Sequence, residues 1–293
     1  MSAIAYVTDS KMLELHRLNN HKTMNFWRLS ANISFSDFGE GDLVFFLSKD
    51  KEHRKKKEKG IVGFGRVSSI AAASIRSMWD RYGIYNGYVS LTEFKEAIRK
   101  VSKDKKLPAK ISAFYLEDVT FFQPVYLSEC GMKISNNVES YIYLKPEKVV
   151  LSLLDLANDS KDLWSGLNEN SETISREKLL YALLETHKKI GDIPRSEKEN
   201  KKAKRNLKAF EEEGYRFFPD SQSEICRLGK ESADVMFYYD KTTDLRSLIG
   251  QAQLYLNHKM HAMLYQLDLR QLINSGPFGT RHQNQYKKHP QDH

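Results

Sequence analysis

Three carboxylates and a lysine lie close together near the C-terminal end of the sequence. Asp234 opens an apolar run, and Asp240, Lys241 and Asp244 follow that run within five residues. Carboxylate oxygens are preferred ligands of Mg²⁺, and a positively charged side chain beside such a site can orient an attacking water. This combination of residue types therefore indicates metal-assisted hydrolysis, provided that the fold brings the side chains together.

The elements that must position these residues can be predicted from hydrophobic spacing. Residues 204–213 are expected to be helical, residues 215–218 and 234–239 to be strands, and residues 244–257 to form an amphipathic helix. This order is similar to that of restriction-endonuclease-like (PD-(D/E)XK) nucleases. Gln251 and Tyr255 match the Q-x-x-x-Y element of some members of that superfamily.

The resemblance implies roles for six candidate catalytic residues. These are Asp234, Asp240, Lys241, Asp244, Gln251 and Tyr255. The metal ligands would be Asp234 and Asp244, with Asp240 as an alternative to Asp244, and the cofactor would be Mg²⁺. Lys241 would position water, while Gln251 and Tyr255 would orient the site. The sequence departs from the family pattern because Asp240 and Lys241 are adjacent, and adjacent strand residues point to opposite faces.

A second resemblance competes for the same part of the chain. His261, Asp268 and the later Ser275-Gly276 have the spacing of the H-x-K, D and G-S signature of phospholipase-D-like nucleases. In that family the histidine is the nucleophile and the lysine holds a phosphate oxygen. Met263 stands at the lysine position and has neither charge nor an N–H donor. The preferred interpretation of residues 261–267 is therefore a core strand.

Three motifs follow one another in the N-terminal half: NFWRLS at residues 25–30, GDLVFF at 41–46 and IVGFGRV at 61–67. Their order resembles the EVE branch of the PUA-like superfamily of nucleic-acid-binding domains. The resemblance implies a β-barrel with flanking helices and a pocket that can take an extruded base. The W-x-G-V-R-N segment of the best-known EVE pattern is missing, so the ligand chemistry is not transferred.

Recognition of an extruded base requires aromatic faces, a few polar groups and phosphate contacts. The aromatic candidates are Trp27, Phe46, Tyr82 and Tyr115; the polar candidates are Ser30, Ser48 and Asn86; the phosphate-binding candidates are Arg28, Lys55, Lys56, Lys57 and Arg66. The same aromatic residues could equally fill a hydrophobic core, so both interpretations stay open.

Local signals between these motifs add four expectations. Residues 51–59 hold six lysines and arginines and are predicted to be an exposed hairpin tip. The alternating glycines at 63 and 65 indicate a strand that another segment approaches closely. Helices are predicted at residues 74–82 and 91–101, the second with Ser90 and Glu93 as a capping box. Further strands are expected at 113–124 and 140–144.

Composition limits the cellular setting and the partner. The net charge is +8 and the pI is about 9.2, which favours a polyanionic partner such as double-stranded DNA, with or without modified bases. Cys130 and Cys226 are too few for a disulfide framework or a thiolate zinc site. The sequence has no signal-peptide pattern and no apolar stretch of about 18 residues, so we expect a cytoplasmic protein that does not contact the membrane.

The length of 293 residues predicts two domains of an α+β protein. Asn, Asp, Ser and Gly accumulate near residues 157–171, which places a PUA/EVE-like recognition domain at 1–157 and an α/β nuclease-like domain at 172–293. The resulting hypothesis is a restriction or antiviral-defence endonuclease that recognises DNA, with a homodimer as one arrangement for cutting both strands. The alternative is a non-catalytic nucleic-acid-binding adaptor whose second half serves dimerisation or docking.

Overall fold

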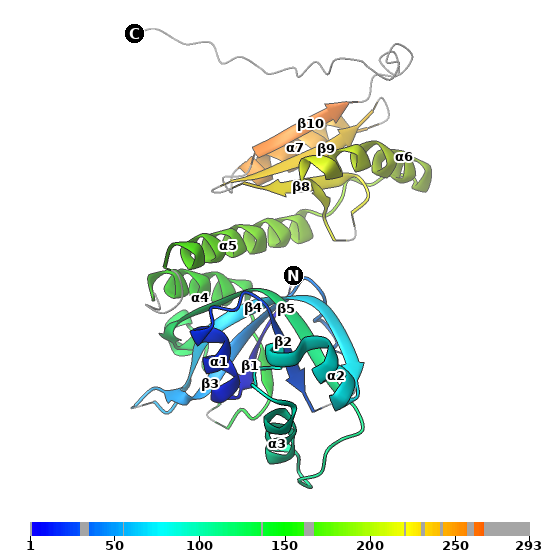
Figure 1. Ribbon diagram of the computed structural model, residues 1–293. Coiled ribbons are helices and arrows are strands. Elements are labelled where there is room, and N and C mark those ends of the chain that lie inside the picture. The colour runs from blue at the N-terminus through cyan, green and yellow to red at the C-terminus, as the bar shows by residue number, and fades with distance from the viewer. Residues whose placement is uncertain are drawn as a thin grey trace. The chain divides into compact units, whose positions relative to one another are not determined.

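The computed structural model describes residues 2–29, 35–54, 56–135, 137–160, 167–219, 221–229, 232–240, 243–256 and 261–266 (Figure 1). The chain forms two compact units. The first comprises Met1–Ile190 with Leu228–Ala233, and the second comprises Gly191–Arg227 with Asp234–His293. The sequence-based boundary lay between residues 157 and 172, whereas the two units divide at residues 190 and 191. Each unit is described by itself below.

The first unit is built on a six-stranded mixed sheet. Its strands are β1 (Ala3–Thr8), β2 (Met24–Arg28), β3 (Leu43–Glu52), β4 (Lys59–Ala73), β5 (Ile111–Val125) and β6 (Tyr141–Tyr143), in the order β2-β5-β4-β3-β1-β6. β1 and β3 are parallel and the other pairs are antiparallel. Among the described strands β2 and β6 are the two edges, so the sheet is open and the predicted closed barrel is not formed.

Helices cover both faces of this sheet. They are α1 (Ser10–Leu18), α2 (Ile75–Tyr82), α3 (Leu91–Val101), α4 (Glu147–Asp159) and α5 (Leu167–Ile190), with the short 3₁₀ helices η1 (Gly83–Asn86) and η2 (Leu127–Cys130). Side-chain caps begin three of them: Asp9 accepts from Lys11 N–H, Ser74 from Ser77 N–H and Ser90 from Glu93 N–H. The predicted cap at Ser90 is thereby confirmed.

Strand β3 divides the core of the first unit into two layers. Val44 and Phe46 pack in one apolar cluster with residues of α1, α2 and α3. Leu43, Phe45 and Leu47 pack in the other cluster with residues of α4 and α5. Side chains of a strand alternate between its faces, so this uninterrupted apolar run is buried on both sides. Burial of each such side chain contributes about 1.5–3 kcal/mol, which explains why the run predicted a strand.

The glycines of β4 allow its close approach to β5. A Cβ atom added at Gly63 would lie 2.6 Å from the carbonyl oxygen of Thr120, and one at Gly65 would lie 3.0 Å from Leu116 Cβ. The close approach predicted from the alternating glycines therefore comes from a neighbouring strand of the same sheet. The glycines serve the fold and leave no opening for a ligand at these positions.

The second unit contains a four-stranded sheet. Its elements are α6 (Glu197–Leu207), η3 (Lys208–Glu213), β7 (Arg216–Phe217), β8 (Glu224–Leu228), β9 (Ala233–Tyr239), α7 (Leu245–Leu256) and β10 (His261–Gln266), with strand order β10-β9-β8-β7. β7 and β8 are antiparallel, while β9 and β10 are parallel and are connected through α7. The strands predicted at 234–239 and 261–267 and the helix predicted at 244–257 are confirmed; β8 was not predicted.

The two faces of β9 contact different helices. Met236 and Tyr238 pack with Ala203 and Leu207 of α6. The ring of Phe237, which points to the other face, lies 5.6 Å from the ring of Tyr255 in α7. Because neighbouring residues of a strand point to opposite sides, Asp234 shares the α6 face with Met236 and Tyr238. This division decides which polar residues can meet in the second unit.

The described helices contain no segment of the length and apolarity needed to cross a bilayer. Both cysteines, Cys130 and Cys226, are buried and carry free thiols. Burial raises the pKa of each thiol, to about 12 for Cys226, so both stay protonated at neutral pH. The two thiols therefore act as small core side chains.

Candidate functional site

Two of the predicted base-stacking residues are part of the core. Phe46 is fully buried, and its ring stacks on that of Phe26 at 5.9 Å. Trp27 is 9% exposed and packs against the ring of Phe94 at 5.7 Å. Neither indole nor phenyl face is open to a nucleobase, so these two residues stabilise the first unit.

Three predicted polar contacts also have structural partners. The Arg28 guanidinium lies over the ring of Phe35, 4.6 Å from its centroid. The Ser48 hydroxyl is buried and lies 3.3 Å from the Ser10 hydroxyl. Asn86 is buried in the turn before α3, where its carbonyl oxygen accepts a hydrogen bond of 2.8 Å from the Asn25 amide. These interactions fix loops and helix ends around the sheet.

Arg66 is buried in an ion pair within the first unit. Its guanidinium contacts the carboxylate of Glu177 in α5, and its Nε donates to Glu177 Oε1 at 3.3 Å. The side chains are 15% and 2% exposed, respectively. Burial lowers the pKa of Arg66 to about 10, which still leaves the side chain charged at neutral pH. The predicted phosphate contact is thus occupied by a carboxylate of the same unit.

Tyr82 and Tyr115 form a surface pair. Their rings stack with a centroid separation of 5.4 Å and an interplanar angle of 23°. The guanidinium of Arg81 lies 5.6 Å from the Tyr82 ring, and both tyrosines are only partly buried. Among the four aromatic candidates, this pair is the one that stays accessible for stacking on a base.

Basic side chains concentrate in two exposed segments of the first unit. Residues 49–57 carry six lysines and arginines against two acids, and residues 99–110 carry six against one. All of these basic side chains that the structure describes are exposed. Lys56, which donates to the Ser128 hydroxyl at 3.0 Å, and Lys57 lie in the predicted hairpin tip. Ser30 and Lys55 lie outside the described residues. The second segment was not predicted, although its charge pattern is visible in the sequence.

The predicted acids of the second unit do not meet one another. Asp234 pairs with Arg227, with an oxygen-to-nitrogen distance of 2.7 Å. Asp240 accepts from Lys202 at 3.2 Å on the α6 side. Asp244 begins α7: it accepts from the Ser247 hydroxyl and from Arg246 N–H, and the bond from Ser247 holds its pKa below the usual value. The predicted combination of Asp234 with Asp244 is therefore not assembled.

The remaining predicted positions lie at or beyond the end of the described chain. Lys241 and Asp268 fall outside the described residues. His261 begins β10 opposite Asp234 of β9. The interpretation of residues 261–267 as a strand is confirmed, while the histidine's predicted role as a nucleophile stays a prediction.

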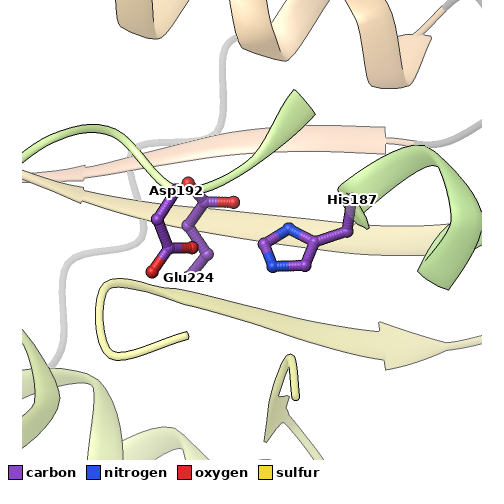
Figure 2. Close-up of side chains that lie close together, drawn as sticks. All are labelled: His187, Asp192 and Glu224. Carbon is purple, nitrogen blue, oxygen red and sulfur yellow. The ribbon is translucent and has the colours of Figure 1, made fainter. Parts of the chain in front are cut away.

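A different pair of acids lies beside the two predicted residues of α7. Carboxylate oxygens of Asp192 and Glu224 lie within 4.8 Å of each other. Gln251 Nε2 donates to the carbonyl oxygen of Gly191 at 3.0 Å, which fixes the loop that carries Asp192. Figure 2 shows both carboxylates. His187, also labelled there, lies in the last turn of α5 in the first unit, so no role beside the carboxylates is assigned to it.

Tyr255 connects this acidic pair to the core of the second unit. Its side chain is fully buried, and its ring lies 6.1 Å from that of Phe218. Burial raises the pKa of the phenol, and the nearby Glu224, Cys226 and Asp192 raise it further. The hydroxyl therefore stays protonated and can donate a hydrogen bond toward negative charge. Gln251 and Tyr255 thus lie near acids, but near Asp192 and Glu224.

Glu224 escaped prediction because its strand is short. The segment EICRL alternates polar and apolar residues over five positions, too few to separate a strand from a loop. The alternation was nevertheless the available signal, since it places Glu224 and Cys226 on the face opposite Ile225. Asp192 follows a glycine after α5 and has no motif of its own.

Comparisons with known proteins bear on the first unit. No protein-family model and no curated protein matches the chain. Crystal structures of ASCH from Zymomonas mobilis and of two of its point mutants match with TM-scores of 0.38, 0.38 and 0.37 at 15% identity. They cover 53% of this chain and 94%, 99% and 95% of their own chains. The N-terminal half thus resembles the ASCH domain of the PUA-like superfamily.

Proposed function

We propose that the protein binds nucleic acid through the exposed basic segments at residues 49–57 and 99–110. The observation that carries this proposal is the exposure of their described lysines and arginines, which form few ion pairs with the few acids between them. Phosphate contacts from such side chains supply most of the affinity for nucleic acids, and the net charge of +8 adds long-range attraction. The stacked Tyr82 and Tyr115 offer a surface on which a base can stack.

Replacement of Lys56 and Lys57 by glutamine is expected to weaken binding and its salt dependence together. Each lost phosphate contact should reduce the slope of log K against log salt by about 0.9 for duplex DNA and about 0.7 for single strands. Titrations of labelled DNA and RNA at several salt concentrations measure both quantities. Lys133→Gln with Lys148→Gln removes two exposed charges elsewhere in the first unit and is the matched control. An unchanged slope in the hairpin variant would exclude this segment as a phosphate contact.

We further propose that the second unit hydrolyses phosphodiester bonds with Mg²⁺. The observation in favour is the pair Asp192 and Glu224, which offers hard oxygen ligands beside Gln251 and Tyr255. This donor chemistry fits Mg²⁺. When bound, the cation would polarise the phosphate and activate water. In this arrangement Gln251 holds the Asp192 loop, and Tyr255 stabilises the negative charge of Glu224.

Glu224→Gln is expected to lower Mg²⁺-dependent cleavage by about 100-fold or more, the scale found when one electrostatic group of an active site is removed. Asp234→Asn is the informative control, because Asp234 lies on the opposite face of β9 and pairs with Arg227. Cleavage rates of both variants are measured on one substrate after circular dichroism has shown that they fold. Loss of activity in Asp234→Asn with retention in Glu224→Gln would return the site to the positions first predicted.

The finer proposal concerns the substrate. The motif order at residues 25–67 supports DNA, with or without modified bases, as the target of a restriction-type defence protein. Incubation with unmodified DNA, with DNAs that carry different base modifications and with RNA, each with and without Mg²⁺, distinguishes the possibilities by scoring retention and cutting. Retention of a substrate with no cutting under any condition would identify the protein as a non-catalytic adaptor.

A further inference from the structure

The first unit contains a cavity of about 360 Å³ that the proposed function does not use. Its wall comes from β6, from the start of α4 and from α5, and includes Tyr143, Lys145, Glu147, Tyr181, Glu185 and Lys188. Small-molecule sites typically span about 300–1,000 Å³, so the cavity fits a small ligand and excludes a macromolecule. The chemistry of its polar groups identifies the class of ligand.

Two carboxyl groups in the wall share a hydrogen bond. Glu147 and Glu185 are hydrogen-bonded to each other, and Lys189 Nζ lies 2.9 Å from Glu147 Oε2. Two carboxylates at this separation cannot both be ionised without strong repulsion. Burial, followed by the contact with Glu147, raises the pKa of Glu185, while the hydrogen bond to Glu185 lowers the pKa of Glu147. Glu185 therefore holds the shared proton, and Glu147 carries the charge that faces Lys189.

Tyr181 adds a third polar group. Its side chain is 1% exposed and borders the cavity, and its hydroxyl has no hydrogen-bond partner among the residues that the structure describes. Burial, Glu185 and Glu147 together raise the pKa of the phenol, so the hydroxyl stays neutral. A buried hydroxyl without a partner is uncommon, because native structures pair nearly all such groups. The unpaired hydroxyl beside an acidic pair indicates that a ligand completes the arrangement.

The lysines of the wall do not compensate this acidity. Lys145 Nζ lies 3.8 Å from the Asp37 carboxylate and 5.4 Å from the centroid of the Tyr143 ring. Lys188 is exposed to solvent. Three carboxyl groups, those of Asp37, Glu147 and Glu185, thus border the cavity and would repel a phosphate or carboxylate ligand.

From this geometry we propose that the cavity binds a small organic cation with a primary ammonium group. An ammonium has three N–H donors and no acceptor, which matches the Glu147 and Glu185 carboxyl groups and the Tyr181 hydroxyl. The ring of Tyr143 provides a face for the cation or its alkyl chain. The ligand takes the place of the proton between the two carboxyl groups: Glu185 releases that proton to solvent and becomes a carboxylate paired with the ammonium.

Titration calorimetry of the full-length protein with n-butylamine tests this proposal, with n-butanol as the neutral probe of equal length. We expect saturable binding of butylamine, at least 10-fold weaker binding of butanol, and release of a proton. Proton release is detected as a dependence of the heat on the ionisation enthalpy of the buffer. Glu185→Gln cannot release this proton, so the variant should bind at least 10-fold more weakly and without the buffer dependence. Glu172→Gln, on the exposed side of the same helix, should behave like the wild type.

Three outcomes would overturn the proposal. Butylamine might fail to bind folded wild-type protein, butanol might bind as tightly as butylamine, or Glu185→Gln might bind butylamine as tightly as the wild type. Circular dichroism and tryptophan fluorescence establish that each variant is folded before it is titrated. Should Glu185→Gln not fold, Tyr181→Phe replaces it, because it removes the hydroxyl acceptor alone and should weaken butylamine binding without abolishing proton release.

Discussion

Replacement of Glu177 by glutamine is expected to lower the free energy of unfolding of the first unit by about 3–5 kcal/mol. Glutamine keeps the shape of the side chain but removes the charge that faces Arg66, whose guanidinium is 15% exposed. A buried cation that loses its carboxylate has neither water nor an opposite charge to stabilise it, and losses of this size follow when one partner of such a pair is removed. Urea unfolding followed by tryptophan fluorescence measures the change.

The design has two controls and a specific readout. All three tryptophans lie within residues 1–190, so their fluorescence reports on the first unit. Glu172→Gln, on the exposed side of α5, should change stability by less than about 0.5 kcal/mol. The double replacement Arg66→Met with Glu177→Leu removes both charges and should regain most of the loss. Equal losses in the single and double variants would show that side-chain packing, and not the unpaired charge, causes the effect.

Acidification is expected to destabilise the first unit through His16. The imidazole is fully buried in α1, and its Nδ1 lies 3.0 Å from His21 Nδ1. Burial, then the neighbouring His21, lowers the pKa of His16 to about 3, whereas the unfolded chain has a value near 6.5. Between about pH 6.5 and pH 3 the unfolded chain therefore binds a proton that the folded protein does not. The free energy of unfolding should fall by up to about 1.4 kcal/mol for each pH unit lost in this window.

Unfolding curves at pH 7, 5.5 and 4.5 measure this slope. His16→Gln removes the titrating group and should flatten the pH dependence, whatever its effect on stability at pH 7. His53→Gln, in the hairpin between β3 and β4, is the control and should keep the wild-type slope. The assignment to His16 fails if the His16→Gln variant loses stability with acid as steeply as the wild type.

Local sequence was sufficient where an element is long or strongly patterned. The apolar run at residues 43–47, the capped helix after Ser90 and the amphipathic helix at 244–257 were predicted and are present as β3, α3 and α7. The first strand, β1, was missed, since its six residues lie at the start of the chain and it pairs in parallel with β3. A parallel partner lies far away in sequence, so no local turn signal announces it.

The closed barrel was predicted from a resemblance, and the pairing of distant strands decided otherwise. β2 pairs with β5, and β6 pairs with β1, which leaves the described sheet open at both ends. Strand order depends on contacts between segments up to about a hundred residues apart. Hydrophobic periodicity marks which residues become strands but carries no information on which strands become neighbours.

The same distinction applies to the candidate sites. The sequence by itself determined that the chain is basic, where its exposed lysines lie, and that Gln251 and Tyr255 share a face of one helix. The tertiary structure decided which acids meet that face. Asp234 points toward α6 and pairs with Arg227, whereas Glu224 and Asp192 lie beside Gln251 and Tyr255. The reason is physical: alternation along a strand assigns each side chain to a face, but only packing decides what covers that face.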